Sequence, residues 1–313
     1  MNDAMKFSIA FLDMTMARTV YYDRLMDAAK ASAHFTEDDS SADILFPAED
    51  TAMETNWPRY GNRESAFIRG AHDLPKYDAY VQRVALSGRG VCIINMDPSV
   101  RLPLYLRNLN NVIVADGCLP VWERVINPRT ISMPALPVII GGAPVTRTVL
   151  ASFRGVKSHP CRKAIFNLHD GKDFICQPVS QDNHLGLLDA TVGKSDMAFA
   201  DLMATSTFAI VPRGDSLFSY RLLEAMSFGC VPIIVSDGWV LPFDRVVDWQ
   251  NVALHIPESE IRRIPFILKS LSAERIVALQ TAVANTYAAH FATLDAIIAT
   301  LAAELRQIVK SNP

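Results

Sequence analysis

The sequence lacks the features that mark several common classes of protein. Its five cysteines form no C-x-x-C pair, which disfavours a zinc or disulfide framework and predicts free thiols in a reducing compartment. Lys and Arg total 30 against 33 for Asp and Glu, with no basic run, which argues against nucleic-acid binding. No apolar run reaches the roughly 18 residues of a membrane-spanning helix, and the first one, 6–12, is too short for a signal peptide. These absences predict a cytoplasmic protein.

Two catalytic motifs are also absent. No G-x-G-x-x-G sequence follows an expected strand, which disfavours a dinucleotide-dependent oxidoreductase. No G-x-S-x-G sequence occurs, which disfavours a serine hydrolase. What the chain does have is a composition that is 50% hydrophobic over 313 residues, enough to bury a sizeable core.

Short apolar runs alternate with segments of helical periodicity along the whole chain. The expected strands are 6–12, 43–46, 91–95, 111–115, 138–140, 152–154, 174–178, 208–211, 233–235 and 252–256. The expected helices are 19–33, 73–85, 162–168, 197–204, 219–228 and 260–271. This alternation predicts an α/β fold of βαβ units with parallel sheets, whose strands are apolar on both faces because helices cover them.

A stretch rich in Pro and Gly, 127–144, is typical of a linker. It predicts two Rossmann-like parallel-sheet domains facing across a cleft, with ligands at the carboxyl ends of the strands. The expected division is 1–140 for the N-terminal domain, 141–290 for the C-terminal domain, and 291–313 for a C-terminal helix that can pack back on the first domain. Apolar residues at 294, 297, 298, 301, 305 and 308 share one face of this long helix and predict core packing.

The densest chemistry lies in residues 207–249, which are predicted to form strand, loop, helix and strand. The loop Arg213-Gly214-Asp215-Ser216 follows the first strand. Ser219 can cap the helix, and Gly229 ends it. Free N–H groups in the first turn of a helix, together with its dipole, suit an anionic ligand.

Charged side chains strengthen the expectation of an anion site. Arg213 and Arg221 can add charge-assisted hydrogen bonds to a phosphate. Glu224, three residues after Arg221, lies on the same helix face, where a carboxylate suits the hydroxyls of a ribose. The simpler interpretation is that Arg221 and Glu224 form a surface ion pair and that Arg213 is a solvated loop residue.

The motifs of this block resemble the exostosin family of glycosyltransferases. The matching runs are Ser219-Tyr-Arg-Leu-Leu-Glu-Ala, Gly229-Cys-Val-Pro-Ile-Ile, Ser236-Asp237, Leu241-Pro-Phe and Asp248-Trp249. Ser152-Phe153-Arg154-Gly155 resembles the strand that opens the family's donor domain, and Arg162 resembles an arginine of the helix that comes next. In the N-terminal half, 42–47 and Trp57-Pro58-Arg59 resemble a further strand of the family and its sequel.

The resemblance implies a GT-B architecture with the acceptor side first and the nucleotide-sugar side second. It implies an inverting, metal-independent glycosyltransferase without a cofactor, which moves a sugar from a UDP-sugar co-substrate to a hydroxyl of a glycan or glycolipid. The chain has no Asp-x-Asp, the metal–diphosphate motif of the other main glycosyltransferase fold. Cationic side chains must then neutralise the leaving diphosphate. For so compact a relative, the resemblance suggests a bacterial enzyme of cell-surface polysaccharide or lipopolysaccharide synthesis, at the inner face of the membrane.

The donor site implied by the resemblance combines arginines for the diphosphate, a carboxylate for the ribose, and loop residues for the diphosphate or the sugar. Its expected members are Arg154, Gly155, Arg162, Pro212, Arg213, Gly214, Asp215, Ser216, Ser219, Arg221, Leu222, Glu224 and Asp237. No metal ligand is expected among them.

The catalytic base is expected in the N-terminal half, at the end of a strand. An inverting transfer needs a base that takes the proton of the acceptor hydroxyl as the hydroxyl attacks. Asp97 and Glu49 are preferred, and Asp50, Asp116 and His72 are further candidates. Each of the carboxylates also fits the simpler role of a helix cap or turn residue, and His72 fits that of a surface residue.

Two other functions agree with the same residues. A nucleotide-sugar epimerase would act on the donor without any acceptor, and a non-catalytic relative would bind nucleotide-sugar or glycan without turnover. The expected partners are a nucleotide-sugar donor and a glycan or glycolipid acceptor, with membrane contact only through the acceptor and no nucleic acid.

Overall fold

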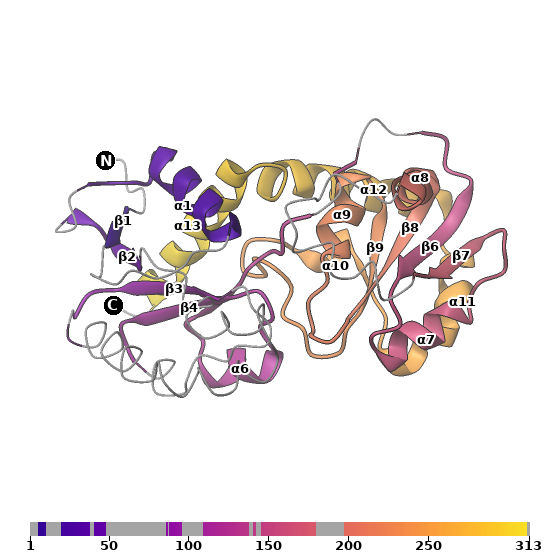
Figure 1. The fold of residues 1–313 in the computed structure, drawn as a ribbon, viewed down its shortest axis with the longest axis horizontal. Helices are drawn as coiled ribbons and strands as arrows, with labels where there is room; N and C mark the ends of the chain where they lie inside the picture. Colours follow the sequence, from indigo (N-terminus) through magenta and orange to yellow (C-terminus); the bar gives the residue numbers. More distant parts are fainter. Residues whose placement is uncertain are drawn as a thin grey trace. The chain divides into compact units, whose positions relative to one another are not determined.

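The computed structural model describes residues 6–10, 20–37, 41–47, 86, 88–95, 109–137, 140–141, 145–179 and 197–311. These residues form two five-stranded parallel sheets, each in a compact unit of its own (Figure 1). The predicted class, α/β with two parallel sheets, is confirmed. The cleft between two domains stays a prediction.

The first unit comprises Met1–Met133, Val240–Val246 and Thr293–Pro313. Its strands, in sheet order, are β1 (Phe7–Ala10), β2 (Ile44–Pro47), β3 (Val91–Asn95), β4 (Val112–Asp116) and β5 (Thr130–Ser132). Its described helices are α1 (Val20–Ala31), α6 (Val121–Ile126) and α13 (Leu294–Ser311). Helices α1 and α13 pack together. Every residue of β4 is buried, as expected for a central strand of a parallel sheet.

The second unit comprises Pro134–Trp239 and Val247–Ala292. Its strands are β6 (Val149–Gly155), β7 (Phe174–Pro178), β8 (Ser206–Pro212), β9 (Val231–Val235) and β10 (Leu254–His255), in the sheet order β10-β9-β8-β6-β7. Its helices are α7 (Pro160–Phe166), α8 (Met197–Thr205), α9 (Arg221–Ser227), α10 (Trp249–Val252), the 3₁₀ helix η5 (Glu258–Arg263), α11 (Ile264–Lys269) and α12 (Ala273–His290). Helix α8 packs on β6 and β8, and α9 packs on β8 and β9.

The end of α9 shows how the sequence directs the chain back into the sheet. Gly229 has φ +68°, a left-handed conformation that glycine adopts without steric strain. Its N–H donates to Met226 O at 2.9 Å, and the N–H of Cys230 donates to Ala225 O at 2.9 Å. These two bonds make a Schellman motif. The predicted terminal glycine is confirmed, and it leads directly into β9.

One observed strand was not expected, and two expected elements are not found or lie outside the described residues. Strand β5 was expected to be part of the linker, because it has three residues and Pro128 and Pro134 lie close on either side. The expected strand 138–140 is not found at Ile140, and its first two residues lie outside the described part of the chain. The expected helix 73–85 also lies outside the described residues.

The tail forms two helices, and the second, α13, confirms the C-terminal helix expected within 291–313. Helix α12 ends at His290, and the hydroxyl of Thr293 accepts the N–H of Ala296 at 3.1 Å at the start of α13. The apolar face predicted for the second helix is buried at Ile297, Ile298, Leu301, Leu305 and Ile308. Among the described residues no single helix has the length and hydropathy of a membrane span. Only α12 and α13 taken together have that length and hydropathy, which buried core helices can also have.

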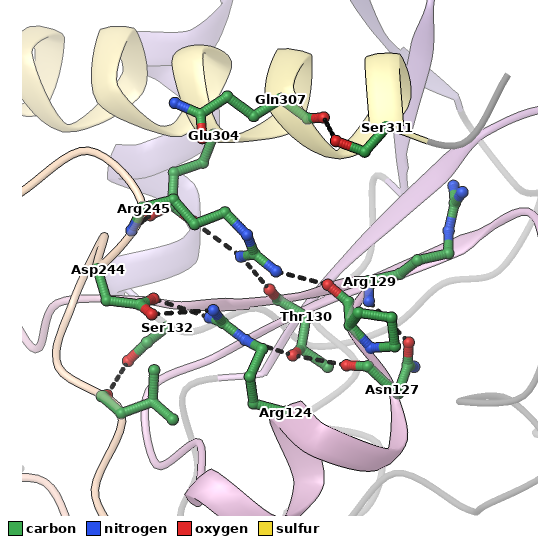
Figure 2. A network of polar contacts seen from close by, with 12 residues as sticks. Arg124, Asn127, Arg129, Thr130, Ser132, Asp244, Arg245, Glu304, Gln307 and Ser311 are labelled. Carbon is green, nitrogen blue, oxygen red and sulfur yellow. Dashed lines mark hydrogen bonds and ion pairs between the residues drawn. The ribbon is translucent and has the colours of Figure 1, made fainter.

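The segment Val240–Val246 belongs to the first unit, although the residues on both sides of it belong to the second. Figure 2 shows the polar contacts that hold it. The hydroxyl of Ser132 donates to Val240 O at 2.6 Å, and Arg124 makes two hydrogen bonds of 2.9 Å to the carboxylate of Asp244. The range 141–290 expected for the C-terminal domain includes this segment, because contacts with distant residues leave no periodic signal in the sequence.

Arg245 connects the same segment to β5 and to α13 (Figure 2). Its guanidinium donates to Thr130 O at 2.7 Å and to Pro128 O at 2.5 Å, and its backbone N–H donates to Oε1 of Glu304 at 3.1 Å. The Glu304 side chain is fully buried. Burial raises the pKa of this carboxyl from 4.5 to about 7, and the nearby Arg245 only partly offsets that rise.

Candidate functional site

The expected donor residues follow strands that end at one edge of the second sheet. Strands β6, β8 and β9 run side by side in one sheet (Figure 1). Because they are parallel, their last residues, Gly155, Pro212 and Val235, lie along the same edge. The strand order reverses between β6 and β8: β7 lies on one side of β6, whereas β8, β9 and β10 follow one another on the other side. Open α/β sheets bind ligands in the crevice at such a reversal. The loops after β6 and β8 therefore form the walls of a candidate site.

Arg162 on α7 bridges these two loops. Its Nε donates to Arg213 O at 2.8 Å, in the loop after β8, and its Nη1 donates to Val156 O at 3.2 Å, directly after β6. The guanidinium lies over the ring of Phe153, with 5.6 Å between Cζ and the ring centroid. The predicted arginine thus lies at the reversal and is held by backbone groups on both sides of it.

Two of the predicted glycines leave the space that Arg162 occupies. A Cβ on Gly214 would lie 2.9 Å from Nη2 of Arg162 and 3.4 Å from Oγ of Ser158. A Cβ on Gly155 would lie 2.9 Å from Cζ of the Phe153 ring on which the guanidinium rests. Any larger residue at either position would therefore displace the arginine or its support.

The electrostatics of this edge favour an anion. Burial lowers the pKa of Arg162, and the like charge of Arg221 lowers it further. The exposed Asp215 offsets these two effects only in part. A phosphate group bound here would relieve both the burial of the charge and the repulsion between the two guanidinium groups.

Arg213 lies at the start of the loop after β8. Its N–H donates to Val235 O at 2.9 Å, which ties the loop to the end of β9. In the side chain, Nη1 is 3.9 Å from Oε1 of Glu258, and Nε is buried with no hydrogen-bond partner among the described residues. A buried N–H without a partner is costly, and a bound oxyanion would satisfy it. The interpretation of Arg213 as a simply solvated residue is therefore wrong.

Arg221 and Glu224 form an ion pair on α9, with Nη1 against Oε2. The Glu224 side chain is only 1% exposed, so the interpretation of a solvated surface pair is wrong. The guanidinium of Arg221 lies 3.8 Å above the ring of Phe199, which orients it by a cation–π contact. Ribose binding by Glu224 stays a prediction.

The start of α9 differs from the expectation in one respect. The helix begins at Arg221 with Tyr220 as its N-cap and has no side-chain capping bond, so capping by Ser219 is wrong. Ser219 is buried, and its carbonyl accepts the N–H of Leu222 at 3.1 Å. With only seven residues, α9 sums few peptide dipoles. The side chains of the arginines, rather than the helix end, are the main source of positive charge at this edge.

Glu258 is a residue of this edge that the sequence analysis missed. It follows β10, and its Oε1 accepts the N–H of Asp237 at 3.0 Å while Oδ1 of Asp237 accepts the N–H of Glu258 at 3.1 Å. The expected residue Asp237 is thus fixed to the next loop of the sheet. The available signal was a carboxylate two residues beyond the expected strand 252–256, in the position that the other site residues occupy after their strands.

Three of the described residues form a cluster of side chains that could bind a metal ion. The ligand atoms of His159, Cys161 and Glu258 all lie within 4.8 Å of one another. The neighbouring Arg213 competes for the carboxylate of Glu258, and burial raises the pKa of the Cys161 thiol to about 11. Nδ1 of His159 also accepts the N–H of Cys161 at 3.3 Å as the cap of α7. These contacts fit a positively charged site for an anion better than a metal centre.

The other expected donor residues have simpler contacts. Arg154 donates to Oε1 of Gln177 at 3.3 Å, on β7, which lies on the opposite side of β6 from β8. Pro212 and Leu222 are buried, and Ser216 O accepts the N–H of Gly214 at 3.1 Å to shape the loop. The structure therefore gathers Arg162, Arg213 and Arg221 about the reversal, whereas Arg154 bonds toward β7.

Both preferred base candidates, Asp97 and Glu49, lie outside the described residues, as do Asp50 and His72. Asp116, at the end of β4, is buried and accepts the N–H of Cys118 at 2.7 Å through Oδ1. That bond is typical of a turn residue, which is the simpler of its two interpretations.

Comparisons with known proteins relate the chain to one family of enzymes. The family model for the exostosin GT47 domain matches residues 109–271, just over half of the chain and all of β6 to β10. The chain is 30% identical to Exostosin-1 of Drosophila melanogaster over 184 residues, which cover 54% of this chain and 24% of that protein. It is 32% identical to the Exostosin-1 homolog of Caenorhabditis elegans over 167 residues, which cover 48% of this chain and 43% of that protein.

Among solved structures, a glycosyltransferase from Rickettsia africae is similar over the full length of both chains, with a TM-score of 0.46 and 11% identity. The matched parts of the curated relatives make up less than half of their own lengths. The range that the family model matches includes the three arginines, the two glycines and Glu258 described above. The chain belongs to the exostosin GT47 family of glycosyltransferases.

Proposed function

We propose that this chain is an inverting, metal-independent glycosyltransferase that moves a sugar from a UDP-sugar to a hydroxyl of a glycan or glycolipid. The observation that carries the proposal is the gathering of Arg162, Arg213 and Arg221 at the reversal of the second sheet. Partly buried guanidinium groups that repel one another, one of them with an unsatisfied Nε, favour a ligand with closely spaced negative charges. The diphosphate of a nucleotide-sugar is such a ligand.

In the proposed reaction the acceptor hydroxyl attacks the anomeric carbon while the diphosphate leaves from the opposite face. A base removes the hydroxyl proton, and Asp97 and Glu49 remain the candidates for it. Negative charge develops on the leaving oxygen, and fixed donors that point to it are usually the largest catalytic contribution. Arg162 is suited to this role because backbone carbonyls on two loops already hold its guanidinium.

The proposed setting is the cytoplasm at the inner face of a bacterial membrane, in cell-surface polysaccharide or lipopolysaccharide synthesis. The cysteines support a reducing compartment, since all five are free thiols. Fluorescence microscopy of a tagged chain, beside fractionation of the cell envelope, would test this part of the proposal separately from the chemistry.

The donor site is tested by titration calorimetry with UDP and with UDP-, GDP-, CMP- and dTDP-linked sugars. We expect UDP and UDP-sugars to bind and Arg162→Ala to weaken their binding roughly 10- to 100-fold, the worth of one charge-assisted hydrogen bond to a phosphate. The matched control is Arg263→Ala, since Arg263 is 61% exposed and pairs with Glu260 on the surface. Equal affinities in wild type and Arg162→Ala would contradict the placement of the site.

Turnover distinguishes the remaining alternatives. Transfer to a glycan acceptor that continues in EDTA supports the proposal, and loss of transfer in EDTA contradicts metal independence. Binding of UDP without transfer to any acceptor would indicate a non-catalytic relative. Conversion of the UDP-sugar in the absence of acceptor would indicate an epimerase.

A further inference from the structure

The carboxylate of Glu258 is fixed in place without help from any arginine. Its Oε1 accepts the N–H of Asp237 at 3.0 Å, and its own N–H donates to Oδ1 of Asp237 at 3.1 Å. This reciprocal pair joins the loop after β9 to the loop after β10. The other carboxylate oxygen, Oε2, lies 3.8 Å from Nδ1 of His159, which caps α7 after β6. The carboxylate, from the loop after β10, thus contacts the loops that follow two other strands, β9 and β6.

Arg213, from the loop after β8, is the third partner of this carboxylate. Its Nη1 lies 3.9 Å from Oε1 of Glu258, which is within ion-pair range but too long for a hydrogen bond. Its Nε is buried without a hydrogen-bond partner among the described residues. The guanidinium is therefore oriented by charge on one side and retains an unsatisfied donor for a ligand.

We propose that Glu258 is a positioning residue, which holds the guanidinium of Arg213 in the orientation that the leaving diphosphate of the donor requires. The inference rests on the proposed function. Since Asp237 anchors the carboxylate, the carboxylate is the fixed member of the pair and the flexible arginine adjusts to it. A guanidinium held in this way needs no reorganisation when charge develops on the leaving oxygen.

The same carboxylate has an opposite effect on binding in the ground state. A fixed negative charge beside the donor site repels the diphosphate and reduces the positive potential of Arg213. Glu258 therefore lowers donor affinity while it raises the rate of transfer. A residue that only stabilised the loops would have no reason to change the two quantities in this combination.

The test is the Glu258→Gln variant, which retains an oxygen for the N–H of Asp237 and removes the charge. We expect the donor KM to fall about threefold, from the loss of one partly exposed charge, and kcat to fall about tenfold. The melting temperature stays within about 2 °C of wild type. The control is Glu260→Gln on the same 3₁₀ helix, whose carboxylate pairs with Arg263 at 2.7 Å, and it leaves both constants unchanged.

A double-mutant cycle with Arg213→Ala shows whether Glu258 acts through Arg213. We expect Glu258→Gln to leave kcat unchanged when Arg213 is already alanine. A rise in KM in Glu258→Gln, or losses of kcat that multiply in the double variant, would overturn the inference. If wild type binds no nucleotide and transfers no sugar, the proposed function fails and this inference fails with it. Binding and transfer by wild type with multiplying losses leave the proposed function intact and overturn the inference alone.

Discussion

Glu304 gives the first unit a stability that depends on pH near neutrality. Its carboxyl is fully buried beside Arg245, Asp244 and Arg124, and burial raises its pKa from 4.5 to about 7. Between these two pKa values the folded chain binds more protons than the unfolded chain, so the free energy of unfolding falls as pH rises. Integrated over pH 5 to 8, the loss from this one carboxyl is about 2.5 kcal/mol.

The Glu304→Gln variant removes the titration and keeps an oxygen for the N–H of Arg245. We expect urea unfolding at pH 5, 6, 7 and 8 to show that the free energy of unfolding of wild type minus that of the variant falls by about 2.5 kcal/mol across the series. Because all other groups titrate equally in both proteins, the difference isolates Glu304. Glu260→Gln, at an exposed carboxylate, is the control and keeps a constant difference.

A difference between wild type and Glu304→Gln that stays constant from pH 5 to 8 would refute this reasoning. It would mean that the carboxylate stays ionised in the folded chain and that Arg245 fully compensates its burial. A value of wild type minus variant that rises with pH would have the wrong sign and would refute it as well.

Three further substitutions test the packing described above. Gly229→Ala should lower the free energy of unfolding by about 1–2 kcal/mol, because alanine is strained at φ +68°, and the added Cβ would lie 3.1 Å from Nη2 of Arg147; chemical denaturation measures it, and an unchanged midpoint would contradict it. Gly214→Ala should weaken UDP binding in calorimetry with an unchanged circular dichroism spectrum, because its Cβ would lie 2.9 Å from Nη2 of Arg162; unchanged affinity would argue against that arginine. Leu305→Ala, at a fully buried position of α13, should cost about 2–5 kcal/mol, and a loss below about 1 kcal/mol in urea unfolding would show that this helix contributes little to the core.

Strands with continuous apolar runs could be predicted from the sequence, and β3 and β7 have the predicted bounds. Strand β5 could not, because its buried polar side chains depend on distant or irregular partners. The hydroxyl of Thr130 donates to Asn127 O, and that of Ser132 donates to Val240 O, 108 residues along the chain. When hydrogen bonds of this kind satisfy the buried polar side chains of a strand, its sequence shows neither alternating polar and apolar residues nor a continuous apolar run.

The candidate site was predictable where its residues come after strands within the family motif. Gly155, Arg162, Arg213 and Gly214 are of this kind, and the structure brings them together. Glu258 was not, because it comes after a strand of two residues and its partner Arg213 is 45 positions away in the sequence. Local patterns identify the residues at the end of each strand, whereas the order of strands in the sheet decides which loops meet.

The discontinuity of the first unit has a consequence for how the chain reaches its native state during synthesis. All five strands of the first sheet precede residue 133 and are synthesised first. Arg245 and Glu304 are synthesised more than 100 and more than 160 residues later. The whole of the second unit, up to Ala292, is synthesised between residue 133 and Glu304. The unit that begins first is therefore completed last. A chain that stops before α13 lacks the buried side chains of Leu301 and Leu305, which that helix contributes to the core. Expression of residues 1–133 alone should yield an aggregating fragment, and the addition of the later segments in trans should restore its solubility.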